Sequence, residues 1–298
     1  MLSLVSCAAP NDNPGGEIEN TDEFFCYSYS YSPEESLCGE RKITEEILND
    51  AYWAFQEKSE VELPKTLTVK VCGKEYSLSL DPASANPSNK SIAQYRPDDA
   101  DGKYSALAVT DFYGNIIRFI VPLRSDEVTS SGTVYDSEKL KEIARNAAAE
   151  HWNGLFDIEN AKETIRLAGK TNHVAYFHVI YRIMKNGYVA AELVVTIDEY
   201  GNIESLATVS PFNVQFHADK YPDFDTEKMR AAADRYVLQW YTKRDKAEIE
   251  SATVTVHLVD FCNGQYGLRF EYTNTGWLSS IQVIVTPEEY ANSLPIEN

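Results

Sequence analysis

The sequence predicts an α+β fold made of two or three related units, each with one helix packed on an antiparallel β-meander. Three observations support this prediction. Helix-start signals recur about every 90 residues, an apolar stripe follows each of them, and β-rich runs separated by glycine-containing turns come next. Similarity at a fixed spacing indicates that one structural unit is repeated along the chain.

The three predicted helices begin in the same way. Each has a hydroxyl residue as N-cap, an acid in the first turn and an apolar residue three positions after the cap. The caps are Thr44, Ser137 and Thr226, with offsets of 137 − 44 = 93 and 226 − 137 = 89 residues. The apolar stripes at helical spacing are Ile47, Leu48, Ala51, Tyr52 and Phe55; Leu140, Ile143, Ala144, Ala147 and His151; and Met229, Ala233, Tyr236, Val237 and Trp240. Helices with one apolar side need a sheet to cover.

Runs typical of β-strands follow each predicted helix. They lie at 66–71, 76–80 and 104–110; at 174–184, 188–197 and 203–209; and at 253–261, 265–272 and 277–286. Asn186-Gly187 favours a two-residue type I′ turn, because both residues tolerate a positive φ. The hexapeptide DFYGNI at 111–116 matches DEYGNI at 198–203 at all but one position, with an offset of 198 − 111 = 87. An offset so close to those of the helices makes coincidence improbable.

These signals divide the chain into four parts. They are a tether at 1–40, a divergent first unit at 41–125 with an insertion at 81–103, a second unit at 126–212 and a third at 213–298. The tether is rich in Asn, Asp, Gly, Pro, Ser and Glu, a composition typical of linkers.

The second unit resembles the PepSY family. The resemblance rests on Tyr181-Arg182, the Asn186-Gly187 turn, the strand VVTID at 194–198 and Gly201-Asn202-Ile203. It covers the second unit best, the third partly and the first weakly. The family includes propeptide domains of secreted metalloproteases and tandem modules of YpeB-like and YcdB-like bacterial envelope proteins. Membership implies protein binding, often the restraint of a protease, with no catalytic residues to carry over.

Charge and hydropathy exclude some classes of partner. The chain has 27 basic and 46 acidic residues among 298, and its net charge of −19 disfavours nucleic acid and anionic lipid surfaces. No apolar run reaches the roughly 18 residues that a membrane-spanning helix needs.

The beginning of the chain resembles the lipobox of bacterial lipoproteins. Leu4-Val5-Ser6-Cys7 is followed by two alanines, which predicts a lipid on Cys7 and an extracytoplasmic protein, lipid-anchored or secreted. Only six residues precede Cys7, so a chance cysteine at a frayed terminus is the competing interpretation.

The other cysteines leave two interpretations open. Cys26 and Cys38 could close a short loop through a disulfide, or they could be isolated thiols that pack as small apolar residues. Zinc is disfavoured because no two cysteines have the C-x₂₋₄-C spacing.

The common signatures of catalysis and cofactor binding are missing from the sequence. It has no G-x-S-x-G, no H-E-x-x-H and no glycine-rich phosphate loop. His173 and His178 are five residues apart, which on a strand places them on opposite faces. We therefore expect a non-enzyme without cofactor or metal.

Aromatic side chains are the remaining candidates for binding, because they can stack on sugars or anchor an interface. The candidates are Tyr27, Tyr29, Tyr31, Tyr188, Tyr266 and Trp277. The alternative is packing within strands, which for the tether tyrosines would be an edge strand with one wet face.

We expect a non-catalytic envelope protein that binds an extracytoplasmic protein, with a protease as one candidate and strand addition at an open sheet edge as one mode. Two alternatives are a carbohydrate or peptidoglycan binder with exposed tyrosines, and a hydrolase whose carboxylates or histidine converge in the fold.

Overall fold

A computed structural model describes residues 23–30, 42–44, 64–81, 93–97, 107–110, 116–121, 132–152, 156–171, 173–208, 222–240, 246–260, 265–273 and 281–288. The chain divides into two compact units. The first holds Met1–Tyr52, Asn186–Tyr188 and Pro222–Asn298, and the second holds Trp53–Lys185 and Val189–Tyr221. The first unit is therefore assembled from both ends of the sequence.

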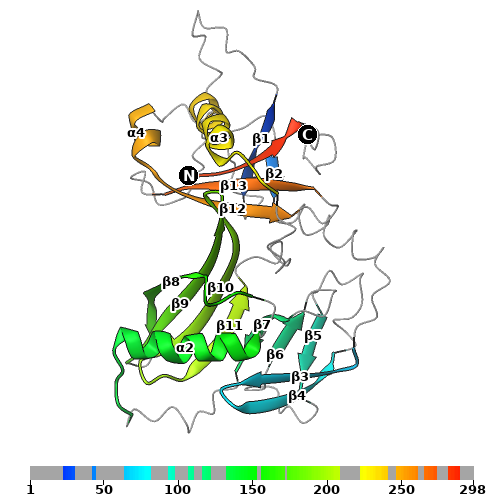
Figure 1. The fold of residues 1–298 in the computed structure, drawn as a ribbon, viewed down its shortest axis with the longest axis vertical. Coiled ribbons are helices and arrows are strands. Elements are labelled where there is room, and N and C mark those ends of the chain that lie inside the picture. Colours follow the sequence, from blue (N-terminus) through cyan, green and yellow to red (C-terminus); the bar gives the residue numbers. More distant parts are fainter. Residues whose placement is uncertain are drawn as a thin grey trace, which may run out of the picture. The chain divides into compact units, whose positions relative to one another are not determined.

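Strands dominate the part of the chain that the structure describes, which contains fourteen strands and three helices (Figure 1). The helices are α2 (Ser137–His151), α3 (Thr226–Trp240) and α4 (Lys246–Ser251). The protein is thus mostly β, and the prediction of an α+β fold of tandem helix-on-meander units is wrong.

The first unit contains a mixed sheet with the strand order β2-β1-β14-β13-β12. Its strands are β1 (Phe24–Ser30), β2 (Lys42–Thr44), β12 (Thr253–Asp260), β13 (Tyr266–Thr273) and β14 (Ile281–Pro287). β1 pairs with β14 antiparallel and with β2 parallel. α3 packs on β14, β1 and β13 and buries Met229, Ala233 and Val237. The prediction of a tether over 1–40 is therefore wrong for Phe24–Ser30, which is a paired strand.

The second unit contains a larger sheet with the order β8-β9-β10-β11-β7-β6-β5-β4-β3. The strands in chain order are β3 (Thr66–Val71), β4 (Lys74–Leu80), β5 (Ala93–Arg96), β6 (Leu107–Thr110), β7 (Ile116–Ile120), β8 (Lys162–Thr171), β9 (Val174–Lys185), β10 (Tyr188–Asp198) and β11 (Ile203–Thr208). α2 contacts both β11 and β3. The sheet therefore curves around this helix.

The prediction of separate tandem units is wrong because the outer strands of the predicted meanders pair with further strands instead of forming sheet edges. β11 pairs antiparallel with β7, which the sequence had assigned to the unit before it, and β14 pairs with β1. An unpaired strand edge exposes a row of N–H and C=O groups, and pairing with a strand from elsewhere in the chain satisfies them.

The apolar stripes of the second and third predicted helices are correct. Leu140, Ala144 and Ala147 of α2 are buried against the sheet of the second unit. The caps lie one residue earlier than predicted, because the carboxylates of Asp136 and Asp225 accept hydrogen bonds from backbone N–H groups in the first turns of α2 and α3. A carboxylate at this position satisfies an unpaired amide and interacts favourably with the helix dipole. Thr44 ends β2, and the helix predicted after it lies outside the described residues.

The predicted turns between strands are correct where the structure describes them. Asn186 and Gly187 have φ values of 44° and 86°, as a type I′ turn requires, and Cys72-Gly73 also has positive φ at both residues. The strands that the sequence reading missed are β2, β5, β7 and β8, and β1 was anticipated only as the edge-strand alternative for the tether tyrosines. β5 lies within the predicted insertion at 81–103.

The two copies of the repeated hexapeptide belong to adjacent hairpins. β6 pairs with β7 and β10 pairs with β11, and each pair shifts register at the same point of the repeat, at Thr110 and at Ile197. The hairpins join through their second strands, β7 and β11. A repeated sequence thus gives two neighbouring hairpins of one sheet.

Candidate functional site

Burial removes most of the predicted binding tyrosines from solvent. Tyr27 and Tyr29 of β1 are 0% and 2% exposed, and Tyr188 is fully buried. The Tyr188 hydroxyl donates to the backbone oxygen of Pro222 at 2.7 Å. The structure therefore favours the packing alternative for these three, and their proposed role as exposed binding aromatics is wrong.

Of the three other predicted aromatics, Tyr266 is the one with a described position. Tyr266 is half-buried at the start of β13, and both Tyr31 and Trp277 lie outside the described residues. A glycan site built from stacked tyrosines needs several open faces. The described tyrosines of the predicted set do not supply them.

Cys26 is a free thiol in β1. Burial raises its pKa to about 12, so the thiol stays protonated and unreactive at neutral pH. Its predicted disulfide partner, Cys38, lies outside the described residues, as does Cys7 with its predicted lipid.

The described histidines are separate from one another. His151 ends α2 between Phe119 and Trp152, with ring centroids 6.0 and 4.6 Å away, and burial lowers its pKa to about 4. His173 has a φ of 68° in the β8–β9 turn, and His257 is buried in β12. Among the residues with described positions, no group of three or more His, Cys, Asp or Glu could hold a metal.

One half-buried polar network joins α3 to β13 in the first unit. Asp234 accepts hydrogen bonds from the Tyr272 hydroxyl at 2.6 Å and from Nε of Arg230 at 2.7 Å. The Arg230 guanidinium also lies over the Tyr272 ring, 5.1 Å from its centroid. Burial raises the pKa of Tyr272, so its hydroxyl remains a donor and the network fastens α3 to β13.

The open edge of β8 is the feature of the second unit best suited to contact another molecule. β8 pairs with β9 on one side, and no strand in the described part of the chain pairs with its other side. The strand has ten residues, and those from Arg166 to Thr171 are all exposed. Leu167, with 55% of its surface exposed, is one of the few large apolar side chains in the described residues that face solvent.

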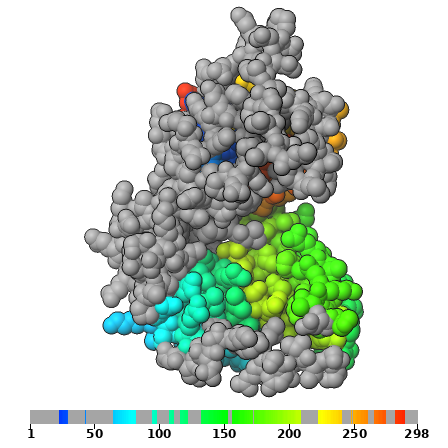
Figure 2. Space-filling model, turned by 180° about the vertical axis from the view of Figure 1, so that it is seen from behind, coloured from blue at the N-terminus to red at the C-terminus, as the bar shows by residue number. Residues whose placement is uncertain are grey.

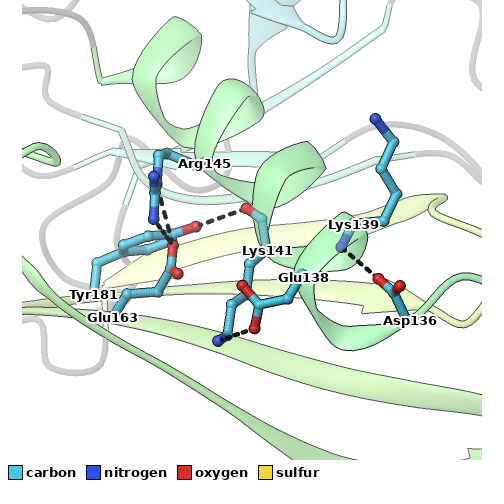
Figure 3. Close-up of polar contacts among 7 residues, drawn as sticks. All are labelled: Asp136, Glu138, Lys139, Lys141, Arg145, Glu163 and Tyr181. Carbon is cyan, nitrogen blue, oxygen red and sulfur yellow. Dashed lines mark hydrogen bonds and ion pairs between the residues drawn. The ribbon is translucent and has the colours of Figure 1, made fainter.

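α2 holds the first half of β8 in place. Nε and Nη2 of Arg145 both donate to Oε2 of Glu163, at 3.2 and 2.9 Å, and the Tyr181 hydroxyl of β9 donates to the backbone oxygen of Lys141 (Figure 3). Both contacts run from one helix to neighbouring strands. The edge is therefore fixed before any partner arrives, which lowers the entropic cost of binding to it.

Both ends of β8 are fixed by turns. Before the strand, the Asp157 side chain accepts from the backbone N–H and the side-chain amide of Asn160. After the strand, Thr171 pairs with Val174 across a tight turn containing His173. Sequence reasoning missed this strand because its second half contains Ala168, Gly169 and Lys170, which disfavour strands. The alternation of polar and apolar residues from Thr164 to Leu167 was the available signal.

Comparison of the chain with models of known protein families, with curated proteins and with solved structures found no match. In the described part of the chain, no helix combines the length and apolarity required to cross a bilayer.

Proposed function

We propose that this chain is a non-catalytic binding protein that holds an extended segment of a partner protein as an added strand on β8. The open edge of β8 carries this proposal. In strand addition, the backbone of the ligand hydrogen-bonds to the free N–H and C=O groups of the edge, and side chains on the two faces supply specificity. The PepSY-like sequence pattern and the predicted lipid on Cys7 suggest an extracytoplasmic partner.

The shape and attachment of the edge support this mode of binding. Ten residues is longer than most strands, and edges of this length are usually shortened, covered or interrupted by proline. β8 has no proline, and the contact between Arg145 and Glu163 keeps it in a strand conformation. Its exposed Leu167 offers apolar area to a neighbouring side chain.

Selection of linear peptides on the full chain tests the proposal. A displayed library of random ten-residue peptides, matched to the length of β8, is panned on the purified protein. The enriched peptides are then added while amide hydrogen exchange is followed by NMR. Because alternate N–H groups of an edge strand point outward, we expect every second amide of 162–171 to exchange more slowly.

Proline substitution supplies the matched variants. Of two consecutive strand residues, one N–H points toward β9 and the other away from it. Of Arg166→Pro and Leu167→Pro, we therefore expect one to weaken the fold and the other to keep it while losing the peptide. Enriched peptides that leave the β8 amides unchanged, or a library that yields no binder, would overturn the proposed function.

A further inference from the structure

The open edge of β8 has two chemically different sides. The register pairs Lys162 with Arg182 and Arg166 with His178. Directly opposite residues of antiparallel strands lie on the same face of a sheet. Val179 and Tyr181 of β9 belong to the core under α2, so Lys162, Arg166, Arg182 and His178 lie on the face away from that core. Burial and the neighbouring Arg166 lower the pKa of His178, so the positive charges of this face at neutral pH are those of Lys162, Arg166 and Arg182.

This basic face is unusual in a chain with a net charge of −19. Lys162 and Arg166 are exposed, and like charges directly opposite each other destabilise a sheet. Arg182 is paired with Glu192 of β10, the one carboxylate among the described residues that is bonded to this group. No carboxylate in the described part of the chain is bonded to Lys162 or Arg166, so the described residues compensate the charge of this face only in part.

The other side of the edge is apolar over Ile165 and Leu167, and Lys170 follows on the same side after the register shift. Ile165 packs against the core, and Leu167 follows it two positions later with most of its side chain in solvent. Glu163 on the same side is already bonded to Arg145. A strand added beside β8 would therefore place alternate side chains next to Lys162 and Arg166 on one face, and next to Ile165 and Leu167 on the other.

We propose that the segment received by β8 alternates acidic and apolar residues, with its carboxylates beside Lys162 and Arg166 and its apolar side chains beside Ile165 and Leu167. This inference rests on the proposed function and names its partner class. Carboxylates at these positions supply the negative partners that no described residue provides for Lys162 and Arg166. In Figure 2 the green atoms, which belong to α2 and to the strands that follow it in the sequence, form part of the visible surface.

A second copy of the chain is a poor occupant of the same edge. β8 carries three basic residues, Lys162, Arg166 and Lys170, against the single acid Glu163. Two such edges placed side by side would repel each other, which is how natural edge strands avoid self-association. An acidic strand from another protein meets attraction at the same positions.

Three synthetic ten-residue peptides test the inference on the full chain. In all of them Val occupies every second position, and the other positions are Glu, Gln or Lys. Binding is followed by fluorescence anisotropy, and amide exchange of 162–171 is measured in parallel. Two cross-strand ion pairs account for about two- to thirtyfold in Kd, so we expect the Glu peptide to bind about tenfold more tightly than the Gln peptide and the Lys peptide more weakly than both. The advantage of the Glu peptide should shrink as salt is raised.

Charge-reversed variants connect the preference to this face. Lys162→Glu with Arg166→Glu should reverse the order of the Glu and Lys peptides. Lys139→Glu with Lys228→Glu makes the same change in net charge on α2 and α3, and should leave the order unchanged.

The outcomes separate the two proposals. If all three peptides bind alike and slow the β8 amides, the acidic preference is overturned while strand addition stands. If a library-selected peptide protects β8 but the Glu peptide does not bind, the acidic preference again fails alone. If no peptide protects β8, both proposals fail. If the protein sediments as a dimer and the β8 amides exchange slowly without any peptide, the choice of occupant is overturned.

Discussion

Phe119 and Leu206 pair with each other across β7 and β11, although they occupy the same position in two copies of a repeat. Their separation, 206 − 119 = 87, equals the offset between the two matching hexapeptides. Both side chains are fully buried in the core of the second unit. The two hairpins are therefore related by a local two-fold axis that passes near this residue pair.

The axis makes an exchange of the two side chains informative. Phe119→Leu and Leu206→Phe should each destabilise the protein by about 1–3 kcal/mol, the first by leaving a void and the second by overpacking. The double variant keeps the total volume of the pair. We expect it to lose less than the sum of the single losses, as measured by urea unfolding. Strict additivity would show that the two sites do not share one packing environment.

Gly201 is predicted to tolerate no side chain. Its φ is +87°, and an added Cβ would stand 2.9 Å from Cδ1 of Ile143 and 3.0 Å from Cε2 of Tyr135. Gly73 is the matched control, because its φ of +75° is similar and nothing lies within 4 Å of an added Cβ. Gly73→Ala should cost about 1 kcal/mol from backbone strain, and Gly201→Ala about 2–4 kcal/mol. Equal midpoints in urea for the two variants would exclude a contribution from the contact with α2.

The ion pair between Arg182 and Glu192 predicts an asymmetric response to mutation. The Glu192 side chain is 5% exposed, whereas that of Arg182 is 29% exposed. Arg182→Ala leaves a buried carboxylate without its cation and should cost about 3–5 kcal/mol. Adding Glu192→Gln to this variant should recover part of the loss, because a neutral amide is less costly to bury than a charge. The free energies come from urea unfolding at pH 7, and a double variant no more stable than Arg182→Ala would contradict this explanation.

His151 predicts a loss of stability in acid. Burial lowers its pKa from 6.5 to about 4 in the folded protein, so the unfolded chain takes up a proton more readily. The contribution of neutral His151 to the free energy of unfolding is therefore complete above pH 6.5. It is lost as the pH falls toward about 4, and its total is about 3 kcal/mol. His151→Phe keeps an aromatic ring beside Trp152 but cannot titrate. Thermal unfolding from pH 7 to pH 4 should show a smaller decline for the variant, and parallel curves would show that His151 is not the titrating group.

Local features of both units could be predicted from the sequence. The turn at Asn186-Gly187 and the strands on both sides of it follow from short-range chemistry, which one window of sequence contains. The apolar faces of α2 and α3 were equally readable from their spacing. The caps were placed one residue late because Ser137 and Thr226 were preferred over the aspartates before them, although Ser, Thr and Asp can all cap a helix.

Long-range pairing was not readable from the sequence. Nothing in Ile203–Thr208 specifies that its free edge meets Ile116–Ile120, because a period of two describes faces and not neighbours. The same limit explains why the burial of the tyrosines of β1 was not predicted. Alternation placed Tyr27 and Tyr29 on one face correctly, but whether that face meets solvent depends on the helix and strands that pack around it. The β8 edge was missed for a third reason, since its exposed half lacks the residues that favour strands.

The pairing of Phe24 with Pro287 has a consequence for how the protein is made. β1 leaves the ribosome before the second unit and hydrogen-bonds to β14, which follows that unit in the sequence. The second unit lies almost entirely between them, so its sheet can form while β1 still waits for its neighbour. Folding of the first unit is therefore a later event that joins strands from either side of the second unit, and β1 requires protection from other unpaired strands until then.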